Sequence, residues 1–171
     1  MKRLAPFAAL ALTAAALAGC GFAPLYGQPG VVSNLAAIDV QAPPGRTGFL
    51  IRQHLDDAFA KDRSAKAAYR MQLSLAESRY PRGVRIDNVA TRYEYVLTAT
   101  YALTAVPSGA LAKRGTVRVE LTYASADQPY ASVAAQQDAQ DRAAEEAAHR
   151  IQLEVAAWLA EGARPAGAKP G

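Results

Sequence analysis

Three segments in which apolar and polar residues alternate place the strongest constraint on the fold of this chain. They are Tyr69–Leu75, Tyr93–Val106 and Thr116–Tyr123. Successive side chains of a strand point to opposite faces, so an alternation of this kind indicates strands that are buried on one face only. Pro107 and Gly109 follow the second segment and predict a hairpin turn before the third. The sequence therefore predicts an antiparallel sheet with one free face.

One further strand and two amphipathic helices complete the predicted domain. Residues Leu35–Val40 are short and apolar and precede a Pro-Pro-Gly sequence, as expected of a first strand. One helix is predicted from Thr47 or Gly48 to about Arg63. A long second helix over about Ser132–Leu159 carries an apolar stripe at spacings of three and four residues. The order β-α-β-β-β-α predicts an α+β two-layer sandwich, with two helices packed on one face of a four-stranded sheet.

The free face of the predicted sheet is rich in threonine. Thr98, Thr100, Thr104, Thr116 and Thr122 occupy its polar positions. Such a face either meets water or is covered by another molecule, and the sequence leaves both alternatives open.

The N-terminus reads as a secretory signal. Lys2 and Arg3 precede the uncharged run Leu4–Ala18, which is shorter than the roughly 20 residues that a membrane-spanning helix needs. The run leads into Gly19 and Cys20, which is the only cysteine of the chain. The sequence L-A-G-C resembles the lipobox of bacterial lipoproteins. That resemblance implies cleavage between Gly19 and Cys20, followed by acylation of Cys20. The alternative is an ordinary signal peptide with a chance cysteine.

This interpretation divides the chain into four parts. Residues 1–19 are the signal peptide, 20–34 a lipidated tether, 35–161 the α+β domain and 162–171 a disordered tail. Loss of the signal peptide lowers the formal net charge from +4 to +2, so the main support for a nucleic-acid partner disappears. The resemblance to bacterial lipoproteins also implies that an aspartate at position 21 would retain the protein in the inner membrane, and Gly21 stands there instead. We therefore expect an outer-membrane lipoprotein on the periplasmic side.

The sequence offers little support for catalysis. A single cysteine and two histidines, His54 and His149, exclude a Cys-based metal site and a three-histidine site. No nucleophile-elbow, H-E-x-x-H or phosphate-binding glycine motif occurs. The neighbouring carboxylates Asp56 and Asp57 point about 100° apart on a helix and do not form a pair. We expect no enzyme, no cofactor and no metal; an envelope hydrolase would need a site that the sequence does not contain.

Basic residues are concentrated in two predicted loops. Residues 79–92 contain four arginines and one aspartate, and Arg79, Arg82 and Arg85 are the first three of these arginines. Lys113 and Arg114 end the loop before the last strand. Guanidinium groups suit phosphates and carboxylates, so these five residues are candidate contacts to an anionic lipid or to a protein wall. In an antiparallel meander the two loops lie at opposite ends. The alternative is that they are simply solvated.

Three stretches of the chain resemble the LptE family of lipopolysaccharide-assembly lipoproteins. The first is C-G-F-A-P-L-Y at residues 20–26, the second is the strand sequence at residues 92–103, and the third leads into the last helix at residues 130–143. Family members often carry glutamate where Gln137 and Gln140 stand here.

The resemblance implies an α/β sandwich and a binding role. Proteins of the LptE family sit partly inside the large outer-membrane β-barrel LptD, support its assembly, bind lipopolysaccharide and help to deliver it to the outer leaflet. The expected partners are therefore LptD, lipopolysaccharide and, through Cys20, the membrane. The rival interpretation is an auxiliary lipoprotein subunit of another envelope lipid transporter.

Overall fold

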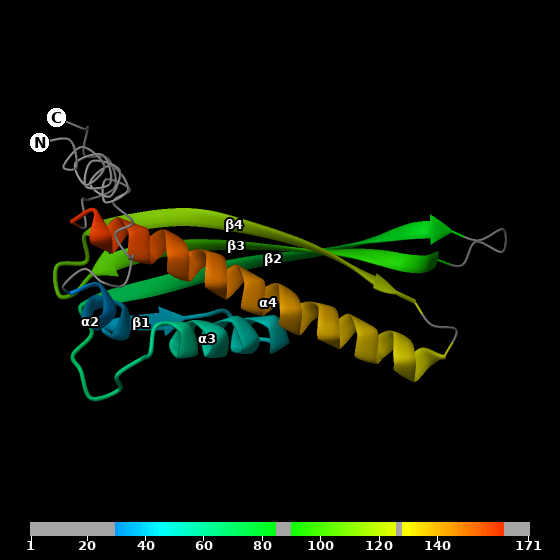
Figure 1. The fold of residues 1–171 in the computed structure, drawn as a ribbon, viewed down its shortest axis with the longest axis horizontal. Coiled ribbons are helices and arrows are strands. Elements are labelled where there is room, and N and C mark those ends of the chain that lie inside the picture. Colours follow the sequence, from blue (N-terminus) through cyan, green and yellow to red (C-terminus); the bar gives the residue numbers. More distant parts are fainter. Residues whose placement is uncertain (1–29, 85–89, 126–127, 163–171) are drawn as a thin grey trace, which may run out of the picture.

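The computed structural model describes residues 30–84, 90–125 and 128–162. The molecule is elongated, and long strands and one long helix run along its main axis (Figure 1). Its elements in chain order are α2 (Val31–Ala36), β1 (Ile38–Gln41), α3 (Arg46–Ala58), β2 (Tyr69–Val84), β3 (Ala90–Ala105), β4 (Leu111–Ala124) and α4 (Pro129–Ala160).

The four strands form one sheet in the order β1-β2-β3-β4. Strands β2, β3 and β4 are an antiparallel meander, and the short β1 pairs in parallel with β2 as far as Gln72. Beyond Gln72 no strand of the described residues pairs with the outer edge of β2, and β4 is the other edge of the sheet. The predicted α+β sandwich is confirmed, with a short third helix, α2, that we did not predict.

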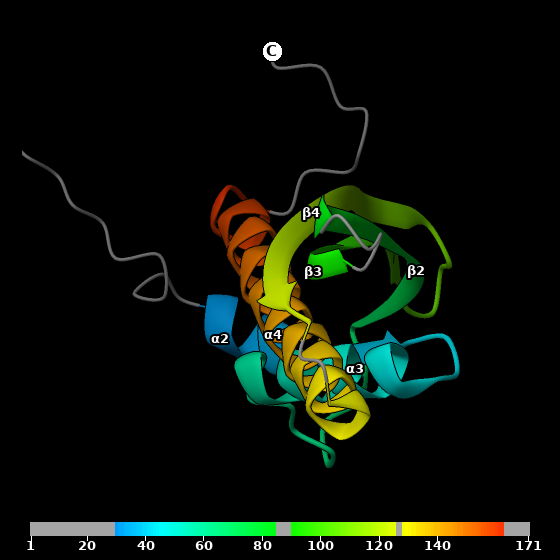
Figure 2. The ribbon, with the colours of Figure 1, turned by 90° about the vertical axis from the view of Figure 1, so that its right-hand side faces the viewer.

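The helices cover one face of the sheet (Figure 2). On β3 this face carries Tyr95, Leu97, Tyr101 and Leu103, which are buried. We call the opposite face the open face. It carries the threonines predicted from the alternation, and most of its side chains are exposed or half-buried. Val96 is an exception, because it is buried on the open face between the neighbouring strands.

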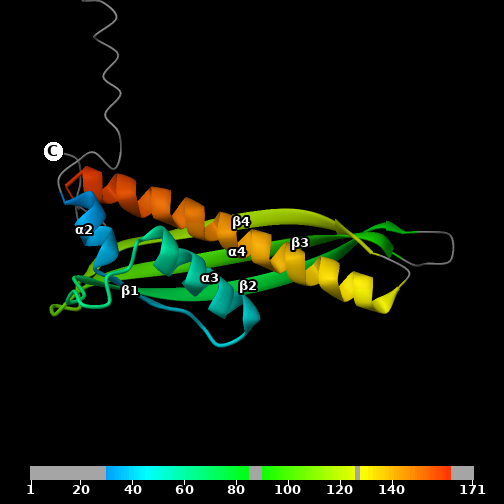
Figure 3. The ribbon, with the colours of Figure 1, turned by 60° about the horizontal axis from the view of Figure 1, so that its bottom comes forward.

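Helix α4 contacts α3 on one side and strands β3 and β4 on the other (Figure 3). Its buried surface is made mainly of alanines, which allow close approach of the backbones. Toward the C-terminal end of α4 the larger Ile151, Val155 and Trp158 replace the alanines, and the Trp158 ring lies edge-on to Tyr69 with centroids 5.6 Å apart. The buried alanines are Ala139, Ala143, Ala144, Ala147, Ala148 and Ala156.

Strand β2 is longer than predicted. The sequence indicated a strand that ends at Leu75 and a loop that includes Pro81 and Gly83, whereas β2 continues to Val84. The reason is the free edge of β2, because a proline has no N–H for a ladder but is tolerated where no second strand needs one. The predicted arginine loop is therefore largely a hairpin of two strands.

Two helix boundaries also differ from the prediction. Val31 and Leu35 are buried in α2, so the packed domain begins within the segment that we interpreted as a tether and first strand. Helix α3 ends at Ala58, earlier than the predicted Arg63, because Ala60 adopts a left-handed backbone with φ of 49° and ends the helical run.

The expected signal peptide and the acylated Cys20 lie outside the described residues, as does all of the expected tail except Gly162. Within the described residues no helix is long and apolar enough to cross a membrane.

Tyr101 fills the centre of the core and depends on a glycine opposite it. Its side chain is fully buried, and Gly115 pairs with it across the β3–β4 ladder. A Cβ atom built on Gly115 would lie 2.6 Å from the Tyr101 ring, which is closer than van der Waals contact allows. Glycine at position 115 therefore makes room for the tyrosine ring.

We predict that Gly115→Ala destabilises the domain. The added methyl group forces the Tyr101 ring out of its position, and overpacking of this kind costs about 1–3 kcal/mol. Urea unfolding measures the change, with Thr122→Ala on the open face of the same strand as the control, which we expect to stay within about 0.5 kcal/mol of wild type. A Gly115→Ala variant as stable as the control would show that the core has room for the methyl group.

Candidate functional site

The predicted arginine cluster is divided between the two faces of the sheet. Arg79 pairs with Tyr95 and lies on the helix-covered side, whereas Arg82 pairs with Arg92 on the open face. Arg85 lies outside the described residues. The structure therefore does not bring Arg79 and Arg82 together, because the extension of β2 makes their side chains alternate.

Arg79 connects the β2–β3 hairpin to the N-terminal half of α4. Its Nη1 donates a hydrogen bond to Gln136 Oε1 at 2.7 Å, and its guanidinium carbon lies 4.8 Å from the centroid of the Tyr93 ring. Tyr93 in turn stacks on Tyr123 of β4. Arg79 is thus engaged within the protein, and its position favours a structural role.

Arg82 and Arg92 lie side by side on the open face near the tip of the hairpin. Arg82 Nε donates a hydrogen bond to Glu94 Oε2 at 2.6 Å, and its Nη2 forms an ion pair with the same carboxylate. Arg92 is exposed, and within the described residues it forms no ion pair. Among its described residues, the open face of the hairpin therefore carries two guanidinium groups, Arg82 and Arg92, and one carboxylate, Glu94.

Lys113 and Arg114 lie at the other end of the sheet, as the predicted meander requires, but they belong to β4 and not to a loop, because β4 begins at Leu111. Lys113 pairs with Leu103 and points to the helix-covered side, where it is half-buried. Arg114 pairs with Ala102 and is exposed on the open face. Arg82 and Arg114 pair with Arg92 and Ala102 of β3, so the two predicted basic groups lie about ten residues or ~33 Å apart along the sheet.

Two buried tyrosines of β3 donate hydrogen bonds to glutamates of β2 and α4. Tyr95 donates to Glu77 Oε2 at 2.6 Å, and Tyr101 donates to Glu154 Oε2 at 2.7 Å. Burial and the neighbouring carboxylate raise the pKa of both phenols well above the ordinary value of 10.0. The sequence analysis missed both glutamates. The signal was available, because a tyrosine at a core position needs a partner for its hydroxyl.

Two polar contacts fix α3 against α4. His54 Nε2 lies 3.1 Å from Asp141 Oδ1, and Gln152 Nε2 donates to the carbonyl of Ala58 at 2.6 Å. His54 therefore has a partner on the neighbouring helix.

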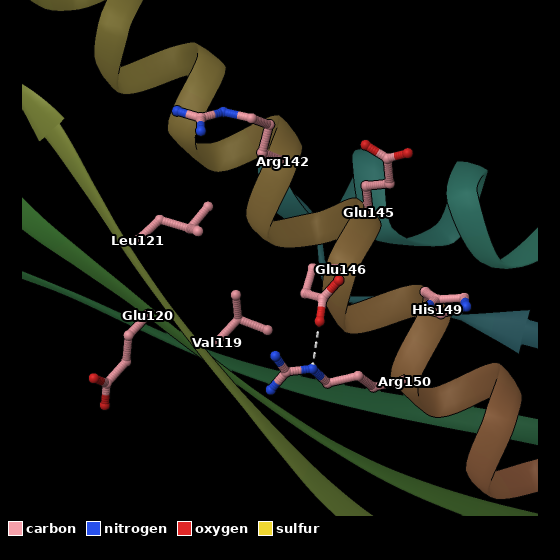
Figure 4. Close-up of a pocket in the computed structure, with 8 residues that line it drawn as sticks. All are labelled: Val119, Glu120, Leu121, Arg142, Glu145, Glu146, His149 and Arg150. Carbon is pink, nitrogen blue, oxygen red and sulfur yellow. Dashed lines mark hydrogen bonds and ion pairs between the residues drawn. The ribbon is translucent and has the colours of Figure 1, made fainter.

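A groove of about 640 Å³ runs between α4 and the edge strand β4 (Figure 4). Val119 and Leu121 point toward the helix, and Glu120 points away from it. Arg150 spans the groove, because its Nε donates to Glu146 Oε1 at 2.6 Å and its Nη1 to the carbonyl of Arg118 at 3.0 Å. Arg150 thus satisfies one carbonyl on the edge of the sheet.

The side chains that line this groove are those of an ordinary protein surface. Arg142 and Arg150 are paired with carboxylates on their own helix, and the wall strand supplies mainly aliphatic side chains. Across the part of the chain that the structure describes, no group of three His, Cys, Asp or Glu side chains is placed to hold a metal ion.

We predict that the stability of the domain falls as the pH rises above about 10. The unfolded chain loses the protons of Tyr95 and Tyr101 there, while the folded chain keeps them because both pKa values are raised. Each tyrosine adds a slope of up to ~1.4 kcal/mol per pH unit.

Urea unfolding at several pH values above 9 measures this slope in wild type and in Tyr101→Phe. The variant should be about 1–2 kcal/mol less stable at neutral pH and should show a smaller slope. Tyr130→Phe is the control, because Tyr130 is 92% exposed and should change neither quantity. Equal slopes in wild type and Tyr101→Phe would contradict the assignment.

Solved structures with the same fold are lipoproteins. A putative lipoprotein from Caulobacter crescentus CB15 is 50% identical, with a TM-score of 0.68, over 80% of this chain and 99% of that one. Rare lipoprotein B from Shewanella oneidensis is 14% identical, with a TM-score of 0.56, over 72% of this chain and 95% of that one. An uncharacterized lipoprotein B from Nitrosomonas europaea is 16% identical, with a TM-score of 0.55, over 73% and 84%. The last two likenesses concern the fold alone.

Comparison with curated protein sequences finds no match. The family comparison is decisive, because residues 35–154 match the family described as LptE, lipopolysaccharide-assembly. These residues include every strand of the sheet, α3 and most of α4. The chain therefore belongs to the LptE family of lipopolysaccharide-assembly proteins.

Proposed function

We propose that this protein is a non-catalytic outer-membrane lipoprotein that supports the assembly of the β-barrel LptD, plugs it, and assists the transport and insertion of lipopolysaccharide. Membership of the LptE family supports the assembly role. Acylation of Cys20 after cleavage at Gly19 would anchor the protein to the membrane on the periplasmic side.

The polar open face of the sheet is the observation that supports insertion of the protein into a barrel. Strands β2, β3 and β4 present hydroxyl, amide and charged side chains there along roughly 50 Å. The interior of a large outer-membrane barrel is polar and water-filled, so an insert needs a polar outer surface. The exposed or half-buried members that make this face polar are Gln72, Ser74, Thr98, Thr100, Thr116 and Thr122.

The hairpin end supplies our proposed contacts to lipopolysaccharide. Arg82 lies on the open face beside Arg92, and Arg85 follows in the sequence. Guanidinium groups bind phosphates through forked hydrogen bonds. Arg79 is the weakest of the predicted candidates, because its guanidinium already contacts Gln136 and Tyr93.

Capture of the tagged, lipidated protein from mild-detergent extracts of its own envelope tests the barrel partner. We expect a large β-barrel protein in about equal amount, identified by mass and retained at high salt. The same capture from cells that produce Cys20→Ser measures how far the complex depends on the anchor. Recovery of a transporter ATPase or permease in place of a barrel would contradict the proposal and favour the auxiliary-subunit interpretation.

We predict that reversal of the hairpin arginines weakens lipopolysaccharide binding. The double variant Arg82→Glu, Arg85→Glu replaces two guanidinium groups, which can donate hydrogen bonds to phosphates, with carboxylates. The affinity for lipopolysaccharide should fall at least tenfold, or by about 1.4 kcal/mol. A salt-titrated binding assay with purified lipopolysaccharide measures the change. Arg52→Glu on the exposed side of α3 is the control, and circular dichroism establishes that all variants are folded. Wild-type affinity in the folded double variant would remove the hairpin from the proposal.

A further inference from the structure

The outer edge of β4 carries main-chain groups that no second strand uses. Ser125 N donates to Thr91 O at 2.9 Å, and hydrogen-bonded pairs alternate along an antiparallel ladder. The odd-numbered residues of this part of β4 therefore bond to β3, whereas the N–H and C=O groups of Glu120 and Thr122 point away from the sheet. Among the described residues these four groups have no hydrogen-bond partner. This edge is therefore free to pair with another strand.

Helix α4 runs beside this edge, so that strand and helix are the two walls of the groove of about 640 Å³ (Figure 4). The half-buried Leu121 and the buried Val119 point toward the helix and make the floor aliphatic. Arg150 closes one end, because its Nη1 donates to the outward carbonyl of Arg118 at 3.0 Å. The edge is therefore occupied by a side chain at Arg118 and is free from Glu120 onward.

The opposite edge of the sheet is less suited to a further strand. Strand β1 already pairs with β2 as far as Gln72, and Pro81 has no N–H to donate. Its free main chain is therefore interrupted, whereas β4 offers donors and acceptors beside a groove that can hold side chains.

We propose that the groove between α4 and β4 binds an unpaired transmembrane strand of the barrel partner while that barrel assembles. The bound strand adds to the sheet at the edge of β4, and its main chain hydrogen-bonds to Glu120 and Thr122. The inference rests on the proposed function and specifies how the protein holds a barrel that is not yet closed.

The two sides of the groove match the pattern of such a strand. Side chains of an added strand alternate between the side of the helices and the open face. Those on the helix side would lie on Leu121 and Val119, whereas the others would join the threonines of the open face. Strands of an outer-membrane barrel alternate apolar residues, which face lipid, with polar residues, which face the lumen. The groove therefore suits that alternation better than a uniformly polar or apolar segment.

The charges along the groove favour a bound segment that is neutral or slightly basic. Three carboxylates and two guanidinium groups line it. Glu146 is paired with Arg150, and Glu120 with Arg118 on the open face. Glu145 is exposed and forms no ion pair with another described residue. It is therefore placed to meet a basic side chain at the end of a bound strand.

Two labelled peptides of about ten residues, the length of a transmembrane β-strand, provide the test. In one, valine alternates with threonine between terminal lysines; the other has the same composition with its valines grouped. Binding to the purified chain from residue 20 with Cys20→Ser is measured by fluorescence anisotropy. The alternating peptide should bind about tenfold more tightly, because the grouped peptide cannot direct its valines to the groove and its threonines to the open face.

Proline substitution on β4 tests the main-chain contact. Glu120→Pro removes an outward N–H and leaves the β3–β4 ladder intact, so the alternating peptide should bind about three- to tenfold more weakly. Glu120→Gln keeps the N–H and should bind within about twofold of the unchanged chain. Thr116→Pro makes the same change on the far side of Arg118, outside the groove lining, and should also stay within about twofold. Circular dichroism establishes that each variant is folded.

Leu121→Thr tests the groove floor without a proline and keeps the β-branched character of the strand. It should weaken the alternating peptide about threefold or more, because the aliphatic contact is reduced. Full affinity in this variant would overturn the proposal if Glu120→Pro does not fold.

Equal affinity of the two peptides would overturn the proposal, as would equal weakening by Glu120→Pro and Thr116→Pro. A stable dimer of the purified chain that Glu120→Pro dissociates would do so as well, because a second copy would then occupy the edge. Capture of the barrel from envelope extracts tests the proposed function separately, so the two can fail independently.

Discussion

The close packing of α4 against both α3 and the sheet is the constraint on which the rest of the structure depends. Ala143, Ala144, Ala147 and Ala148 are at most 1% exposed, and their small side chains let two layers approach one helix from different sides. Within the described chain, α4 contacts α2, α3, β3 and β4. Helix α4 therefore joins the long, twisted sheet to the much shorter helix α3.

That arrangement determines which surfaces remain for binding. All the helices lie on one face, so the open face stays polar along most of its length. The hairpin extends past the part of the sheet that α3 covers, and Arg79 secures it to α4. Among the described residues, exposed basic side chains without an ion pair lie on β3 near the hairpin, on β4 at the opposite end of the sheet and on α3: Arg92, Arg114, Arg46 and Arg52. These features suit a protein that lies along a polar channel, with its two ends in different surroundings.

The sequence predicts the fold better than the binding surfaces. Alternation located β2, β3 and β4, since a one-sided sheet needs apolar residues at every second position. It failed at Pro81, because the turn preference of proline is local, whereas its tolerance within β2 depends on β1 ending at Gln41, which pairs with Gln72, well before Pro81 is reached. Charge alone selected the basic candidates, but the faces on which they lie were not predictable, because the register of β2 decides that Arg79 meets Gln136. Partners such as Glu154 for Tyr101 arise only from tertiary packing.

The most direct test of the central claim is cross-linking in living cells from single positions on the open face. A photoreactive residue at Thr98 or Thr116 lies in the middle of that face on β3 and β4. If the sheet lies inside a barrel, both positions form a cross-link to one large outer-membrane β-barrel protein. Cross-links only to soluble periplasmic or inner-membrane proteins, from a protein that is folded and membrane-attached, would contradict the account.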